Sequence, residues 1–272
     1  MDIKQILLVL SAETASDHTA EIALRLARTH GARVAGLCLH SDPDPPPRGD
    51  ALERARERLQ ALTDPARTWF QELVADHGLS DGWEVGALDG WRDVIVHRAR
   101  LVDLVVADAP AGAAPVYRDV VEALAMGAGS PLLLVPKVAP AASSGHDFDR
   151  VVLAWNGTRE AKRAMADGLC FLRAANEVAV VVAKEETTRS IGQVETDALV
   201  RHLARHGVHA QVLVSEARGR GAGDVLVERC AEFRADLLVM GAFGRPRAAQ
   251  LQLGGATRTL LARAAIPTLL SH

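Results

Sequence analysis

Three glycines near the end of the chain have the spacing and the setting of an anion-binding loop. Gly241, Gly244 and Gly254 follow the apolar run 236–240, which predicts a buried strand, and they precede 257–264, which predicts a helix. Glycine lets the backbone approach a ligand closely and reaches positive φ at little cost. The N–H groups of such a loop and of the helix start can then hold a phosphate. The alternative is a loop that only turns the chain, and the glycines alone leave both interpretations open.

The spacing Gly-x2-Gly-x9-Gly resembles the signature of the universal stress protein family. That signature continues with Ser or Thr, and many members of the family bind ATP with it. Here Gly255 stands at the Ser/Thr position, so a phosphate-binding hydroxyl is missing, although Thr257 follows two residues later and could replace it. The resemblance implies that the chain binds ATP or another adenine nucleotide, with Mg²⁺ as an accompanying candidate.

Composition and charge are those of an ordinary globular protein. Hydrophobic residues make up 49% of the chain, charged residues 24%, and the net charge is −3. No overall field therefore attracts nucleic acid or an acidic membrane surface, and no apolar run approaches the length of a membrane span. The start of the chain lacks the plan of a signal peptide. Cys38, Cys170 and Cys230 are odd in number and far apart, so we expect them to be small buried residues and not a disulfide framework. A cytoplasmic protein is therefore expected.

Strands and helices are predicted to alternate on both sides of a segment of linker composition at 136–148. The predicted strands are 3–10, 32–39, 83–88, 102–107 and 131–135 in the first half, and 150–155, 177–183, 210–214, 236–240 and 267–270 in the second. The predicted helices include 50–77, broken or kinked at Pro65, and 91–100, 120–128, 158–173, 191–206, 224–233 and 257–264. Such alternation indicates an α/β fold, with parallel sheets covered by helices on both faces.

The two halves also repeat each other in sequence, because 99–107 resembles 231–240 and 130–135 resembles 266–270. The family resemblance implies two tandem five-stranded parallel sheets of order 3-2-1-4-5. It divides the chain into a degenerate domain at 1–136 and a nucleotide-binding domain at 149–272. It further implies that the domains pair through their last strands as an intramolecular pseudo-dimer, which could itself form a homodimer.

In a sheet of this order, ligands bind where the strand order reverses, beyond the carboxyl ends of the strands. In the second half these ends are 154–156 and 239–241. Asn156 stands where the family usually has Asp, and its amide can both donate and accept hydrogen bonds. The alternative is an Asn-Gly turn before a helix capped by Thr158.

The resemblance places adenine near Val182, and Arg245 could either face the phosphates or lie in solvent. The candidate nucleotide-binding residues are Ala154, Asn156, Val182, Met240, Gly241, Gly244, Arg245, Gly254, Gly255, Ala256 and Thr257.

Two further motifs are weaker. The segment 218–224 reads Gly-x-Gly-x-Gly from its second residue, but Asp224 stands where a dinucleotide fingerprint needs glycine, so we expect a flexible turn with Asp224 as helix cap. His202 and His206 share a helix face and, with His209, could hold zinc. The segment lacks a His-Glu-x-x-His motif, so solvent-exposed histidines are expected.

The chain shows no nucleophile motif and no pair of carboxylates at the glycine loop, so we expect no catalytic residue and at most slow ATP hydrolysis. We expect a stress-linked sensor or regulator with an unidentified protein partner. Its nucleotide would bind in the second half only, because Asp108 replaces the first glycine in the other half. The alternatives are a nucleotide-free scaffold that acts through protein contacts and a hydrolase or transferase of related architecture.

Overall fold

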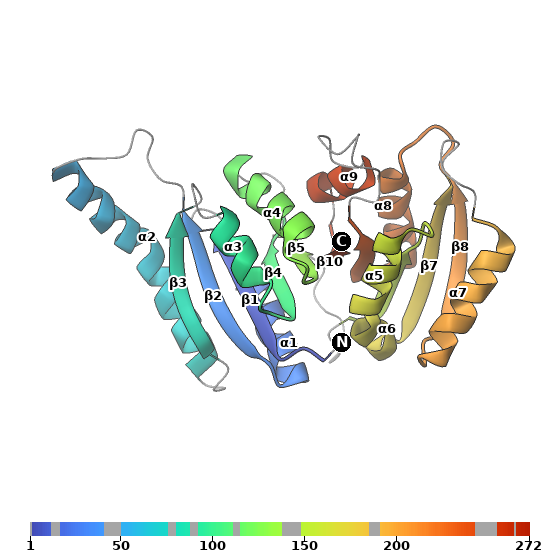
Figure 1. Ribbon diagram of the computed structural model, residues 1–272, viewed down its shortest axis with the longest axis horizontal. Helices are drawn as coiled ribbons and strands as arrows, with labels where there is room; N and C mark the ends of the chain where they lie inside the picture. Colours follow the sequence, from blue (N-terminus) through green and yellow to red (C-terminus); the bar gives the residue numbers. More distant parts are fainter. Residues whose placement is uncertain are drawn as a thin grey trace. The chain divides into compact units, whose positions relative to one another are not determined.

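Strands and helices alternate within each half of the described chain, with two consecutive helices between the first two strands of the second half (Figure 1). The computed structural model describes residues 2–11, 17–40, 50–75, 80–87, 92–110, 115–137, 148–184, 191–242, 255–263 and 265–272. They form two compact units, Asp2–Leu132 and Leu133–His272. Among these residues, no helix has the length and apolar character that crossing a membrane requires.

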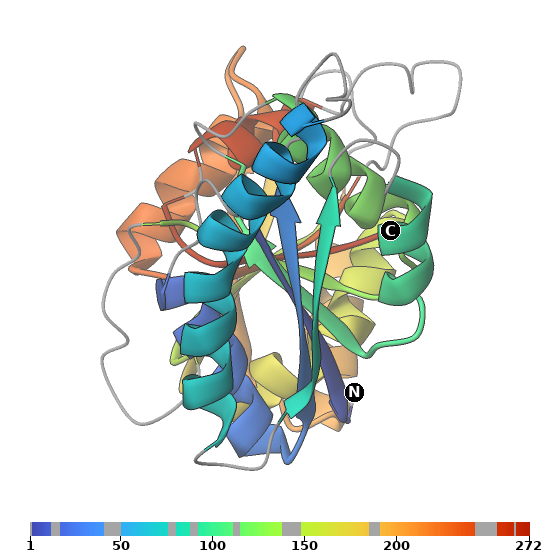
Figure 2. The ribbon, with the colours of Figure 1, turned by 90° about the vertical axis from the view of Figure 1, so that its left-hand side faces the viewer.

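The first five strands form a parallel sheet of order β3-β2-β1-β4-β5. The elements are β1 (Gln5–Ser11), α1 (Asp17–His30), β2 (Arg33–His40), α2 (Asp50–Ala75), β3 (Ser80–Ala87), α3 (Arg92–Ala99), β4 (Leu104–Asp108), α4 (Pro115–Gly127) and β5 (Leu132–Val135). Figure 2 shows α1 and α2 on one side of the strands and α3 and α4 on the other. Because helices cover both faces, every residue of β4 is buried, which explains its unbroken apolar sequence.

The second half repeats this order as β8-β7-β6-β9-β10, again with parallel pairs. The elements are β6 (Arg150–Ala154), α5 (Arg159–Asp167), α6 (Leu169–Ala174), β7 (Glu177–Lys184), α7 (Gln193–Arg205), β8 (Ala210–Glu216), α8 (Ala222–Phe233), β9 (Leu237–Gly241), α9 (Gly255–Arg263) and β10 (Thr268–Ser271). The predicted α/β class and the order 3-2-1-4-5 are therefore confirmed.

The sequence repeat has a counterpart in hydrogen bonding. Asp103 and Asp236 each precede the fourth strand of their half, and each carboxylate accepts from two consecutive backbone N–H groups at the start of the first strand. The donors are Lys4 (2.8 Å) and Gln5 (2.9 Å) in the first half, and Asp149 (2.8 Å) and Arg150 (2.9 Å) in the second. The same residue type thus satisfies the same unpaired donors in both halves.

Some predicted helix boundaries were wrong. The single helix expected at 158–173 is two helices, α5 and α6, which meet at Gly168. A Cβ atom on Gly168 would lie 2.8 Å from Val239 Cγ1, so this position packs directly against β9, and a side chain here would require Val239 or the helix to shift. In the first half α2 continues through Pro65 without a break, and α4 begins at Pro115, where proline is well tolerated.

The predicted cap of α8 was also wrong. Its N-cap is Gly221, which provides no side-chain cap, and Asp224 is the third residue of the helix. An acidic residue in the first turn still interacts favourably with the helix dipole, so Asp224 suits this position without capping the helix.

Candidate functional site

The candidate site lies at the carboxyl ends of β6 and β9, the point where the strand order of the second half reverses. Leu153 of β6 lies beside Val239 of β9, so Ala154, the last residue of β6, and Met240, the residue before the end of β9, lie at the same edge of the sheet. Ala154 is half-buried and Met240 is 4% exposed. In the neighbouring β7, Val182 is buried, so its side chain offers little surface to a ligand.

Gly241 brings β9 into direct contact with the start of α5. A Cβ atom on Gly241 would lie 2.5 Å from the carbonyl carbon of Glu160 and 2.6 Å from the backbone nitrogen of Ala161. Any side chain at this position would therefore force the helix away from the strand. The first glycine of the predicted loop has a packing role whether or not a ligand binds.

Asn156 forms the turn between β6 and α5. Its Oδ1 atom accepts hydrogen bonds from the backbone N–H of Thr158 at 3.2 Å and from the Thr158 hydroxyl at 2.8 Å. Thr158 in turn caps α5 by accepting from the N–H of Ala161 at 3.3 Å, and Gly157 has a φ of 73°. The turn-and-cap interpretation is therefore correct. Because the oxygen already accepts these bonds, Asn156 would meet a ligand through its amide N–H donors.

Glu160 is a residue of this site that sequence reasoning missed. Its side chain is 9% exposed, and its Oε1 atom accepts from Arg159 Nε at 2.6 Å. Burial opposes ionisation of Glu160, but hydrogen bonds from Arg159, from its own backbone N–H and from Thr158 together lower its pKa. The carboxylate is therefore ionised at neutral pH, beside Gly241 and at the positive end of α5. An acidic residue in the first turn after the Asn-Gly turn was the available signal.

The start of α9 offers a different environment. Gly255, its first residue, is exposed, and a Cβ atom there would meet nothing within 4 Å. Ala256 is half-buried, whereas Thr257 is only 3% exposed, which leaves its side chain little surface for a phosphate. Three of the sequence-predicted residues, Gly244, Arg245 and Gly254, lie outside the described residues.

The first half has a carboxylate where the second has Gly241. Asp108 ends β4 and is 1% exposed, and its Oδ1 atom accepts from the Thr19 hydroxyl at 2.6 Å. The phenol of Tyr117 donates to the backbone oxygen of Asp108 at 3.3 Å. Burial, with the Asp108 charge as a second cause, raises the pKa of Tyr117 well above its ordinary value. A buried acid with polar partners thus occupies this position.

The three histidines of the weaker metal hypothesis do not converge. His202 Nε2 lies 3.2 Å from Lys162 Nζ, and its ring packs edge-on against His206, while His206 and His209 are exposed. Burial lowers the pKa of His202, and the neighbouring Lys162, His206 and Arg205 lower it further. Within the described part of the chain, no group of three His, Cys, Asp or Glu residues could hold a metal ion.

A sequence model described as the universal stress protein family matches residues 104–272, more than half of the chain. The chain belongs to the universal stress protein family. The match runs from β4 to the end of β10 and includes the whole candidate site. No curated protein matches this universal stress protein in sequence.

Solved structures share the fold of this universal stress protein over nearly its full length. A universal stress protein from Archaeoglobus fulgidus DSM 4304 has a TM-score of 0.73 and 12% identity, with 98% of this chain and 95% of that chain covered. A functionally unknown protein from Pseudomonas aeruginosa PAO1 has a TM-score of 0.65 and 18% identity, with 99% and 92% covered. A putative universal stress protein from P. aeruginosa UCBPP-PA14 has a TM-score of 0.64 and 15% identity, with 99% and 93% covered. At these identities the likeness concerns the fold.

Proposed function

We propose that this universal stress protein binds an adenine nucleotide, ATP or AMP, in a domain spanning 149–272, and that occupancy of this site regulates a stress response through a protein partner. The observation that carries the proposal is the meeting of three features at one sheet edge. They are the end of β9 at Gly241, the Asn156 turn and the open start of α9. In the sequence, the glycines from Gly241 to Gly254 have the spacing of the family signature.

The chemistry offered by this edge suits a phosphate. The first N–H groups of α9, from Gly255 to Thr257, have no partner within their own helix and carry the positive end of its dipole. The Asn156 amide would add donors from the other side of the strand-order reversal. The backbone near Val182, beside β6, is the proposed neighbour of the adenine ring.

Hydrolysis of a bound ATP should be slow. Residues 237–272 contain no Asp or Glu, so this segment supplies neither a base for water nor a carboxylate for Mg²⁺. A magnesium ion would arrive with the nucleotide phosphates, and its role would be to neutralise their charge. We therefore propose a binding protein rather than an enzyme.

A nucleotide-free scaffold is the second candidate, and Glu160 is the observation that favours it. Its ionised carboxylate already occupies the positive end of α5 and would repel a phosphate placed close to Gly241. Gly255 lacks the hydroxyl of the family signature, which points in the same direction.

The discriminating experiment restores the missing hydroxyl. Because the space around Gly255 is open, Gly255→Ser adds a phosphate ligand without a steric clash, and Gly255→Ala adds only the Cβ atom. Hydrogen bonds to charged groups contribute about 1.5–3 kcal/mol, so Gly255→Ser should bind ATP or AMP roughly tenfold or more tightly than Gly255→Ala.

Titration calorimetry of the wild type and both variants measures this difference, and release of adenine compounds from denatured protein gives an independent readout. We expect one nucleotide per chain, because Asp108 fills the equivalent position in the first half. If neither the wild type nor Gly255→Ser binds either nucleotide, the scaffold hypothesis replaces the proposal.

A further inference from the structure

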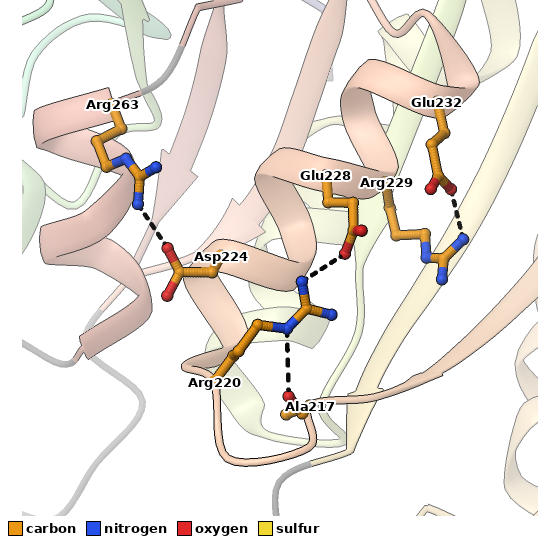
Figure 3. Close-up of polar contacts among 7 residues, drawn as sticks. All are labelled: Ala217, Arg220, Asp224, Glu228, Arg229, Glu232 and Arg263. Carbon is orange, nitrogen blue, oxygen red and sulfur yellow. Dashed lines mark hydrogen bonds and ion pairs between the residues drawn. The ribbon is translucent and has the colours of Figure 1, made fainter.

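The glycine-rich segment between β8 and α8 forms a closely bonded turn. Arg218 and Gly219 both have positive φ, of 50° and 78°. The backbone N–H of Arg220 donates to the Ala217 oxygen at 3.0 Å, and the Arg220 guanidinium lies 2.9 Å from Oε2 of Glu228, the seventh residue of α8. Figure 3 shows the Arg220 side chain, which donates to Glu228 of α8 and, from Nε, to the Ala217 oxygen. These contacts define where α8 begins.

The first turn of α8 is the surface on which α9 packs. Gly223 is buried, and a Cβ atom there would lie 2.6 Å from Thr259 Cβ and 3.0 Å from Ala256 Cα. Contacts this short are not found between real side chains, so α9 lies directly on the backbone of Gly223. Ala256 is the second residue of α9, so this contact is made at the end of the helix that faces the proposed site.

A second contact lies at the other end of α9. Arg263 donates to Asp224 Oδ1 at 2.7 Å, as Figure 3 shows. The side chains of Arg263 and Asp224 are 64% and 38% exposed, and exposed ion pairs contribute little to stability. The buried contact at Gly223 is therefore the one that determines how closely α9 approaches α8.

We propose that Gly223 is a positioning residue of the nucleotide site, which rests on the proposed function stated above. By lacking a side chain it lets α9 approach, and the approach places the N–H donors at 255–257 at the sheet edge. Gly223 thus belongs to the same site as Gly241, although the segment 218–224 that contains it resembles a dinucleotide-binding fingerprint.

The test is a rescue experiment on the full chain. Gly223→Ala should displace α9 and weaken ATP binding roughly tenfold or more, since displacements of about 1 Å have large effects on ligand sites. In that background, Thr259→Gly removes the atom that the new Cβ meets at 2.6 Å, so it should recover affinity. Thr259→Ala keeps that atom and should not. Gly221→Ala is the matched control, because its Cβ would have only an ordinary contact of 3.6 Å with Asp224.

Affinity is measured by titration calorimetry well below the unfolding temperature of each variant, and hydrogen exchange at 255–263 reports the docking of α9 directly. Faster exchange in Gly223→Ala together with recovery by Thr259→Gly supports the inference. Unchanged affinity, unchanged exchange, or equal effects of Thr259→Gly and Thr259→Ala overturn it. If the wild type binds no nucleotide, both the proposed function and this inference are overturned. If the wild type binds nucleotide and Gly223→Ala binds it equally tightly, only this inference is overturned.

Discussion

The hydroxyl of Thr19 donates a hydrogen bond to the buried carboxylate of Asp108 across 2.6 Å. In the second half, the third residue of α5 is Ala161 and the last residue of β9 is Gly241, and here the two backbones make the contact themselves. The same meeting of helix and strand is thus built from side chains in one half and from closely approaching backbones in the other. In the second arrangement the last residue of the strand carries no carboxylate, and the acidic side chain nearby, that of Glu160, comes from the helix.

Replacing Thr19 should show how much the buried hydrogen bond contributes. Thr19→Val keeps the shape of the side chain but removes the donor, and the Asp108 carboxylate then loses a partner in a site that solvent does not reach. We expect a loss of about 1–3 kcal/mol in the free energy of unfolding. Denaturant titration measures it, and Thr19→Ser, which retains the hydroxyl, should lose clearly less. A loss in Thr19→Val that is smaller than the loss in Thr19→Ser would show that the methyl group contributes more than the hydrogen bond and would contradict the prediction.

Two glycines of the candidate site should respond oppositely to alanine. Gly241→Ala places a Cβ atom 2.5 Å from the backbone of α5, and overpacking of this kind costs about 1–3 kcal/mol. Gly255→Ala meets open space at a helix position, where alanine is favoured over glycine by up to about 1 kcal/mol. Thermal unfolding should therefore show a lower midpoint for Gly241→Ala and an equal or higher one for Gly255→Ala. The reverse order would mean that α5 does not rest on Gly241.

The three thiols should differ in reactivity. Burial raises the pKa of Cys230 to about 12, so almost none of it is the reactive thiolate at mildly alkaline pH. Cys170 is half-buried, whereas Cys38 and Cys230 are buried. A chromogenic disulfide reagent should modify Cys170 first in the native protein, and Cys170→Ser should remove the fast phase. Denaturant should make all thiols react at similar rates, and a fast phase that survives in Cys170→Ser would contradict the prediction.

Asp236 should make stability depend on pH in the acidic range. Burial raises the pKa of Asp236, although hydrogen bonds from the backbone N–H groups of Asp149 and Arg150 oppose the shift. Because the folded pKa exceeds the unfolded value of about 3.9, the native state binds the proton more readily between the two values. Protonation of Asp236 therefore contributes most to the stability of the folded protein below the unfolded pKa, and this contribution is lost as pH rises through the folded pKa.

The difference between wild type and Asp236→Asn isolates this contribution. We expect the wild type to gain stability relative to the variant as the acidic range is entered, as measured by thermal unfolding at a series of pH values. A difference that does not change with pH, or one that changes in the opposite direction, would show that Asp236 is not the group responsible.

The pattern of the sequence by itself was sufficient for the class of fold, whereas the order of the strands was implied by the resemblance to the universal stress protein family. Apolar runs such as 104–107 and 237–240 alternate with amphipathic helices, and a chain of this pattern buries its strands only in parallel sheets covered on both faces. The resemblance between 99–107 and 231–240 likewise predicted that both halves share this fold, and Asp103 and Asp236 do make the same hydrogen bonds. These features are local or repeated, so they can be read along the chain.

Only the tertiary structure decided what the individual site residues do. The spacing of the glycines identified Gly241 as a candidate, but its contact with Glu160 depends on how α5 packs against β9. The residues between α5 and β9 in the sequence do not predict that packing. The same holds for Gly223 beneath Thr259, for Gly168 beside Val239 and for the burial of Thr257. Each of these features depends on the distance between segments that are far apart in sequence, and a change of a few tenths of an ångström in that distance matters. Such distances are set by how whole helices pack.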